Sequence, residues 1–186
     1  LIATSVFLLA QRTQRLTAAA QKLQDDTRYI TEAMARDIKF TTIDYSCYNQ
    51  TLVTCYPQDL TGTDDDLNIN LQTNNGEAAV LALKDNSGVQ KLYAVFVPAG
   101  SADGQKKLQF CTFDPANTIL EYPTKCQDLT EWKIITPAGI QAIRLTFWIV
   151  PFLDPFQPCP DQSCDDSPYQ ADVQPRVTLN LQTRPS

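Results

Sequence analysis

The chain has 186 residues, 43% of them hydrophobic, so it can bury one good core and is expected to form one globular domain. Its charge is uneven: residues 1–40 carry six Lys or Arg against four acids (+2), and residues 41–186 carry nine against seventeen (−8). The acidic part argues against nucleic-acid recognition over its surface. The sequence contains no run of ~18 apolar residues, so it predicts no membrane span.

Residues 1–40 predict one long α-helix, because they contain neither Gly nor Pro. Apolar or small residues recur there at helical spacing, namely Leu9, Leu16, Ala20, Leu23, Thr27, Ile30, Met34 and Ile38. At ~1.5 Å per residue this helix is ~60 Å long, about twice the width of the remaining domain, so one end must project.

The two halves of the helix differ in character. Residues 1–10 are apolar nearly all round, so we expect 1–15 to project, whereas 16–40 are amphipathic and should lie on the domain 41–186. The residues expected to face a sheet are Leu16, Leu23, Ile30, Met34 and Ile38. Those expected to have no partner within the chain are Ile2, Val6 and Leu9.

The six cysteines fall into three neighbouring pairs, Cys47 with Cys55, Cys111 with Cys126, and Cys159 with Cys164. Fifteen pairings are possible, and the local ones are the simplest. Each local disulfide would contribute about 2–3 kcal/mol and would imply an oxidising compartment. Zinc is the alternative, but it favours C-x-x-C pairs and often His ligands, and this chain has neither.

After the helix, alternating and β-branched runs predict antiparallel strands. Residues 79–83 and 92–97 flank the turn 85–88 and predict a hairpin. Other strands are predicted at 51–55, 67–71, 108–113, 132–135, 140–150 and 177–181. In 140–150 one face should hold Ile143, Leu145, Phe147 and Ile149.

The C-terminal part should complete the same sheet. Six of the twelve prolines lie in 151–175, which predicts a long extended loop, and 177–181 is expected to close the sheet after it. The fold class is therefore α+β, with the helix covering one face of an antiparallel sheet.

The helix also carries a family resemblance. Residues 23–38 read Leu-x-x-Asp-x-Arg-Tyr-x-x-x-x-x-Ala-Arg-Asp-Ile, and the last predicted strand is led by Pro175-Arg176-Val177-Thr178. This pattern resembles the larger minor pilins among the type IV pilins and type II secretion pseudopilins. It covers the helix and, for the sheet, only the order of elements. The resemblance implies that the family's long apolar N-terminal segment is cut short at Leu1.

The resemblance implies a structural subunit of an extracellular helical filament. Such a subunit is held in the inner membrane before assembly and then packs against copies of itself or other pilins. The expected assembly residues are Ile2, Val6, Leu9, Arg12 and Leu16, with Arg12 and Arg15 at the lipid–water boundary. The alternatives are an adhesin-like tip subunit, whose loop 151–175 contacts a surface, glycan or DNA, and an anchored surface domain that never polymerises.

Catalytic and metal-binding patterns are weak. Without His there is no Ser-His or Cys-His arrangement, and no P-loop occurs, so we expect neither an enzyme nor a cofactor. Asp64, Asp65 and Asp66 offer hard oxygens at short spacing, which makes them a weak calcium candidate, with a solvated loop as the alternative. A second weak candidate consists of Asp161, Asp165, Asp166 and Asp172.

Overall fold

The computed structural model describes residues 2–48, 76–101, 104–113, 126, 128–152, 154–155 and 174–185, with side chains of the helix from Phe7 onward. Its elements are the helix α1 (Ile2–Phe40) and the strands β1 (Thr42–Ile43), β2 (Glu77–Ala78), β3 (Leu81–Lys84), β4 (Gln90–Phe96), β5 (Lys107–Phe113), β6 (Lys133–Ile134), β7 (Ile140–Val150) and β8 (Arg176–Pro185). The α+β class is confirmed. The strands predicted at 51–55 and 67–71, and most of the loop 151–175, lie outside the described residues.

α1 confirms the long helix predicted for residues 1–40. On its exposed side, Arg28 pairs with Glu32 one turn later at 2.6 Å, a spacing that supports a helix. The helix ends where Thr41 Oγ1 donates a 2.7 Å hydrogen bond to the carbonyl of Asp37. The β-branched residues that follow continue as β1, because they fit a strand better than a helix.

The larger sheet has five antiparallel strands in the order β1-β3-β4-β5-β6. β3 and β4 form the predicted hairpin. Its turn is closed by Asp85, whose carboxylate accepts hydrogen bonds from the backbone N–H groups of Ser87 (2.8 Å) and Val89 (2.9 Å). Gly88 adopts φ +90° in this turn, a conformation that favours glycine.

The prediction of a single sheet is wrong. β8 does not join the larger sheet but pairs with β7, and with β2 they form a second antiparallel sheet in the order β2-β7-β8. The chain enters β7 through a turn in which Gly139 adopts φ +88°. Near the start of β7, the backbone N–H of Ala142 donates a 3.0 Å hydrogen bond to the carbonyl of Lys106, the residue before β5.

β7 also contains a bulge that the alternation did not reveal. Its pairing with β8 shifts between Ala142 and Arg144, so Ala142 is buried while Ile143 is 41% exposed. The prediction that Ile143 shares the buried face is therefore wrong. The other members of that face are buried as predicted, namely Leu145, Phe147 and Ile149.

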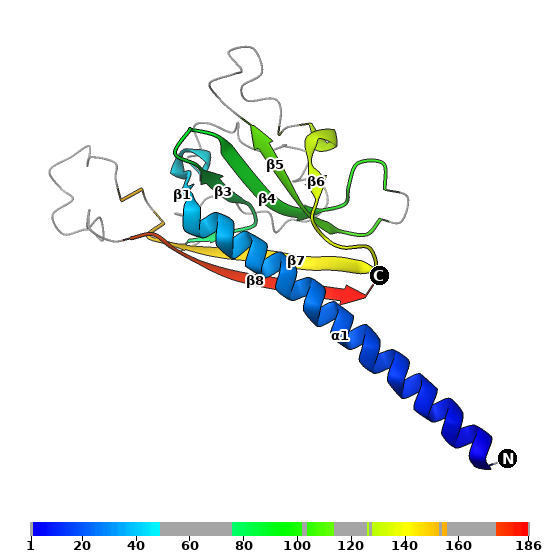
Figure 1. Cartoon of the computed structure of the whole chain (residues 1–186). Helices are drawn as coiled ribbons and strands as arrows, with labels where there is room; N and C mark the ends of the chain where they lie inside the picture. Colours follow the sequence, from blue (N-terminus) through cyan, green and yellow to red (C-terminus); the bar gives the residue numbers. More distant parts are fainter. Residues whose placement is uncertain are drawn as a thin grey trace, which may run out of the picture.

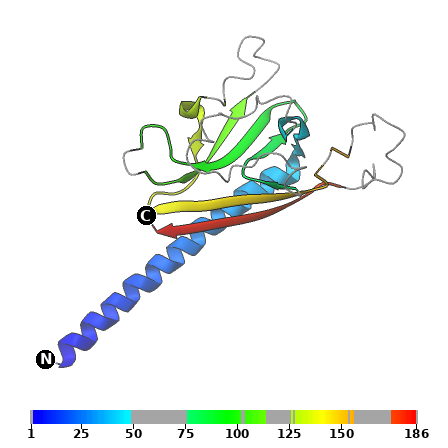
Figure 2. The ribbon, with the colours of Figure 1, turned by 180° about the vertical axis from the view of Figure 1, so that it is seen from behind.

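The second half of α1 lies across the β7–β8 sheet and ends beside β1. In Figure 1 the helix passes in front of β7 and β8, and from behind these strands stand in front of the helix (Figure 2). Ile30 and Met34 are buried where the helix meets the sheets, in a core cluster that contains residues of both. One face of the helix thus covers the core, as predicted.

Gly76 determines how closely the chain before β2 approaches β7. The backbone N of Ile149 donates a 2.8 Å hydrogen bond to the carbonyl of Gly76. Gly76 adopts φ +88°, and a Cβ built on it would collide with the carbonyl oxygen of Ile149. Only glycine fits this close backbone contact without a shift.

Candidate functional site: the N-terminal helix and its attachment

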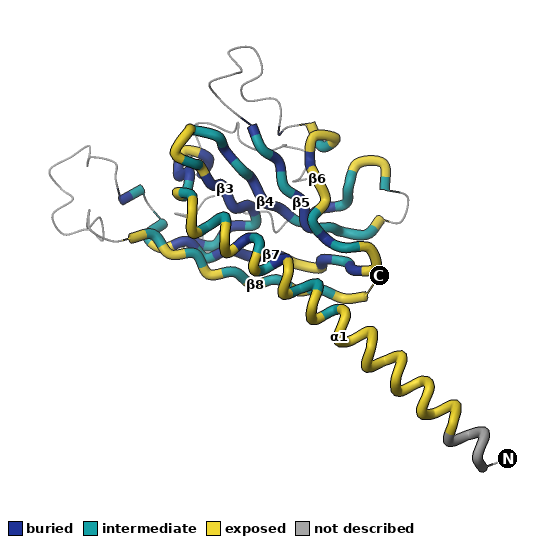
Figure 3. Tube along the Cα trace, viewed as in Figure 1, coloured by how far each residue is buried: buried dark blue, intermediate teal, exposed yellow. Residues whose placement is uncertain are grey.

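The first half of α1 projects beyond the sheets (Figure 3). Every residue from Phe7 to Lys22 is exposed. The large apolar side chains of this stretch have similar exposed fractions: Phe7 61%, Leu8 64%, Leu9 63% and Leu16 63%. Single exposed leucines are ordinary on a protein surface, but these lie close together on one helix and form an apolar surface. We call residues 7–22 the projecting half.

The predicted assembly residues lie on this projecting half where they are described. Leu9 and Arg12 are exposed there, whereas the side chains of Ile2 and Val6 lie outside the described residues. A shallow depression on the same stretch is lined by Leu8, Gln11, Arg12, Arg15 and Leu16.

Leu16 does not face a sheet, which corrects part of the sequence analysis. Partial burial on α1 begins only at Leu23, so the apolar stripe extends beyond the region that the domain covers. Helical periodicity gives the direction of a side chain around the helix but not the position at which the domain ends. Leu16 therefore remains with the assembly residues alone.

The other residues predicted to face the sheets do so. Ile30 and Met34 are buried, and Leu23 and Ile38 are half-buried. A polar contact lies on the same side of the helix, where the hydroxyls of Thr27 and Thr183 of β8 are 3.1 Å apart.

A charged group that the sequence analysis missed fastens the end of α1 to β4. Lys91 and the hydroxyl of Tyr93 both donate hydrogen bonds to one carboxylate oxygen of Asp37. The Lys91 ammonium also lies 5.1 Å from the centroid of the Tyr93 ring and 4.7 Å from that of Phe110. We call Asp37, Lys91, Tyr93 and Phe110 the helix clamp.

The protonation states of the helix clamp follow from its geometry. Burial alone would raise the pKa of Asp37, but the hydrogen bonds from Lys91 and Tyr93 outweigh burial and hold its pKa below the ordinary value. Burial, followed by the bond to Asp37, raises the pKa of Tyr93 well above its ordinary value. The carboxylate is therefore charged and the phenol protonated at neutral pH. A signal for this contact was present in the sequence, because Asp37 lies three residues after Met34 on the buried side of the helix.

A second polar group secures the chain just after β1. Asp44 is buried and accepts a hydrogen bond from the side-chain amide of Gln90. Four residues later, the Tyr48 hydroxyl donates to the carbonyl of Val80 (3.0 Å) and accepts from the N–H of Ala82 (2.8 Å). These contacts fix the exit of the helix against β3 and β4.

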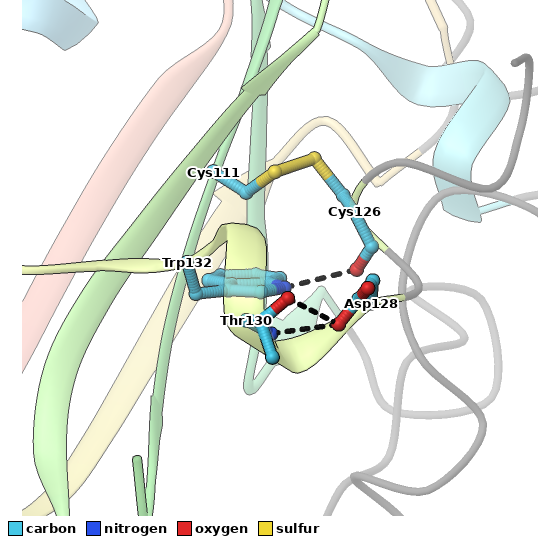
Figure 4. The surroundings of a disulfide bond; sticks show 5 residues. All are labelled: Cys111, Cys126, Asp128, Thr130 and Trp132. Atoms are coloured by element: carbon cyan, nitrogen blue, oxygen red, sulfur yellow. Dashed lines mark hydrogen bonds between the residues drawn. A yellow bond between two sulfur atoms is a disulfide. The ribbon is translucent and has the colours of Figure 1, made fainter. Parts of the chain in front are cut away.

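The disulfide between Cys111 of β5 and Cys126 forms as predicted (Figure 4). The indole N–H of Trp132 donates a 2.9 Å hydrogen bond to the carbonyl of Cys126. The same indole meets Phe96 edge-on, with ring centroids 5.1 Å apart. Cys47 is also disulfide-bonded. The pairings Cys47–Cys55 and Cys159–Cys164 stay predictions, because Cys55, Cys159 and Cys164 lie outside the described residues.

The calcium candidates Asp64, Asp65 and Asp66 also lie outside the described residues, as do the four aspartates of the second candidate. Within the part of the chain that the structure describes, no group of three or more His, Cys, Asp or Glu side chains could hold a metal ion.

Comparison with known proteins leaves the family open. No protein-family model matches the chain, and searches of curated proteins and of solved structures gave no match. α1, the long helix of the described chain, lacks the apolar content that crossing a membrane requires.

Proposed function

We propose that this chain is a structural subunit, a pilin or minor pilin, of an extracellular filament of the type IV pilus kind. It assembles by packing its N-terminal helix against the helices of other copies or of other pilins. The observation that carries the proposal is the projecting half of α1, whose Leu8, Leu9 and Leu16 are each more than 60% exposed. Covering such apolar surface is worth about 25 cal/mol per Å².

The two halves of the helix have separate roles in this proposal. Burial of Ile30 and Met34 and the bonds of the helix clamp hold the second half on the domain. The projecting half is then presented in a fixed direction, so neighbouring helices can pack without first being ordered. A long helix whose second half lies on antiparallel sheets agrees with the arrangement that the residue pattern of 23–38 implies.

The same apolar residues suit a stage in the inner membrane before assembly. In lipid, Leu9 and its apolar neighbours contact acyl chains, and in the filament they contact neighbouring helices. Assembly is then an exchange of lipid contacts for protein contacts, in which side-chain fit decides the outcome. An anchored domain that never polymerises would use only the first of these contacts.

Electron microscopy of cells that express the full-length protein tests the proposal. Leu9→Asp places a charge on the apolar surface and should abolish filaments. Gln21→Asp adds the same charge at an exposed polar position of the same helix and should leave filaments intact. Abundant filaments from the Leu9→Asp chain would overturn the proposal. A wild-type chain that stays in the membrane fraction without filaments would support the anchored domain instead.

A further inference from the structure

All three arginines of residues 41–186 lie on one face of the sheet formed by β2, β7 and β8. Side chains alternate along a strand, so Arg176 and Arg184 of β8 stand on the same side of the sheet. Arg144 of β7 lies opposite Gln182 of β8 and therefore shares that side. These three strands contain no lysine. We call this side of the sheet the arginine face.

The arginine face is turned away from α1. On the other side of β8, Thr183 contacts Thr27 of the helix and Leu179 packs against the core. Figure 2 shows β7 and β8 from the side away from the helix. On the arginine face every side chain of β8 from Arg176 to Arg184 is exposed. Within the part of the chain that the structure describes, this face of β8 is therefore open to a partner.

The charges of the arginine face are mostly positive. Glu77 is the one acid of the described strands β2, β7 and β8, and its carboxylate lies 3.6 Å from the Arg144 guanidinium. The two side chains are 42% and 60% exposed, so water screens this pair. Arg184 is a diagonal neighbour of Arg144 across the strand pair, and it donates a 2.8 Å hydrogen bond to the neutral side chain of Gln141. Two neighbouring guanidinium groups thus share one screened acid, which leaves them able to bind an anion.

Between its arginines the face is neutral and rich in hydrogen-bonding groups. Thr178, Asn180 and Gln182 stand between the two arginines of β8, and each side chain can donate and accept hydrogen bonds. Trp148 of β7 lies opposite Thr178 and is half-buried, so part of its ring is accessible. The two arginines of β8 are eight residues apart, about 27 Å along the strand. The face is therefore a long strip with widely spaced positive charges and neutral polar groups between them.

This strip suits an acidic sugar polymer better than a nucleic acid. One strand of a duplex carries a phosphate every ~3.4 Å, about eight over this length, whereas the face offers three arginines. A sugar chain presents hydroxyls to the neutral side chains and the apolar side of a ring to Trp148. Its carboxylates or sulfates suit the planar guanidinium group, which binds such anions through two parallel hydrogen bonds. We infer that the arginine face binds an acidic polysaccharide along β8, with Arg144, Arg176 and Arg184 holding its anionic groups.

The inference goes beyond the proposed function and does not rest on it. It uses the side of the sheet opposite α1, whereas helix packing uses the projecting half. Leu9→Asp should therefore leave polysaccharide binding unchanged, and substitutions on the arginine face should leave filaments intact. Each of the two proposals can fail without the other.

Binding of the full chain, in an uncharged detergent, to immobilised polymers tests the inference by biolayer interferometry. Polygalacturonate and dextran sulfate supply the two kinds of anion, and methyl-esterified polygalacturonate and dextran are their neutral counterparts. At least one acidic polymer should bind about tenfold more tightly than its neutral counterpart, and more tightly than single- or double-stranded DNA. Binding of neither acidic polymer, equal binding of the neutral ones, or DNA binding that is as tight would each overturn the inference.

Substitutions locate the binding on the sheet. Arg144→Gln and Arg176→Gln should each weaken binding of the acidic polymer about tenfold. Lys133→Gln removes the same charge from an exposed position on β6, outside the arginine face, and should leave most of the binding. Arg176→Gln carries the test alone if Arg144→Gln, which leaves Glu77 without its cation, fails to fold. Equal losses for the arginine and lysine variants would contradict the inference, as would arginine variants that keep full polymer binding and instead lose self-association, which would assign the face to a second copy.

Discussion

At the scale of single residues, Asp37 links the helix to the sheet through Lys91 and Tyr93 of β4. Its side chain is 23% exposed and that of Lys91 is 27% exposed, so solvent screens the pair only in part. A hydrogen bond to a charged group contributes about 1.5–3 kcal/mol to stability. The helix clamp is therefore expected to matter for the stability of the domain as well as for the direction of α1.

Asp37→Asn should make the domain less sensitive to acid. Because folding lowers the pKa of Asp37, its stabilisation is fully present above the unfolded pKa of about 4 and is lost as the pH falls through the lower folded value. The wild type should exceed Asp37→Asn by about 1.5–3 kcal/mol at neutral pH, and the gap should close below about pH 4. Urea unfolding across a pH series measures it, with the exposed Asp25→Asn as control. A gap that does not change with pH would show that the charge of Asp37 is not involved.

Gly76→Ala should destabilise the domain more than Gly100→Ala. Both glycines have positive φ, which costs an alanine about 1–2 kcal/mol. A Cβ at Gly100 meets nothing within 4 Å, but one at Gly76 meets the backbone of Ile149, which adds about 1–3 kcal/mol. Thermal unfolding of the two variants compares them, and equal shifts would mean that β2 can move away from β7.

Residue-level prediction from the sequence was correct where periodicity alone decides. Ile30 and Met34 were placed on the core side because helical spacing fixes direction. The partners of Asp37 were not found, because Lys91 is 54 positions away and their contact depends on how the helix crosses β4. No local pattern contains that crossing.

At the scale of elements, local signals predicted both α1 and the β3–β4 hairpin. For α1 the signal was the absence of Gly and Pro, and for the hairpin it was the turn residues 85–88. The bulge in β7 and the division into two sheets were not predicted. Alternation indicates which residues of a strand share a face, but an inserted residue such as Ile143 shifts every later residue by one position. The division into two sheets depends on the pairing of β7 with β8, and local alternation carries no information about which strands pair.

Large-to-small substitutions along α1 should separate its two halves. Ile30→Ala and Met34→Ala remove fully buried side chains and should each cost about 2–5 kcal/mol. Leu16→Ala is the matched control, exposed on the projecting half, and should change stability by less than about 0.5 kcal/mol. Chemical denaturation gives all three values. A large loss for Leu16→Ala would mean that the domain extends farther along the helix than the structure shows.

At the scale of the whole molecule, the chain separates an attached half of α1 from a projecting half (Figure 1). The sequence predicted the projection from length, since a ~60 Å helix exceeds the width of one domain, and predicted which end projects from the apolar residues 1–10.

Deletion of residues 1–12 measures the central claim most directly. The deleted side chains that are described are all exposed, so circular dichroism should show a thermal transition nearly unchanged from that of the full chain. Electron microscopy of cells expressing the shortened chain should show no filaments, because much of the apolar surface of the projecting half is gone. Filaments formed by a shortened chain that keeps the wild-type thermal transition would contradict assembly through the projecting half of α1.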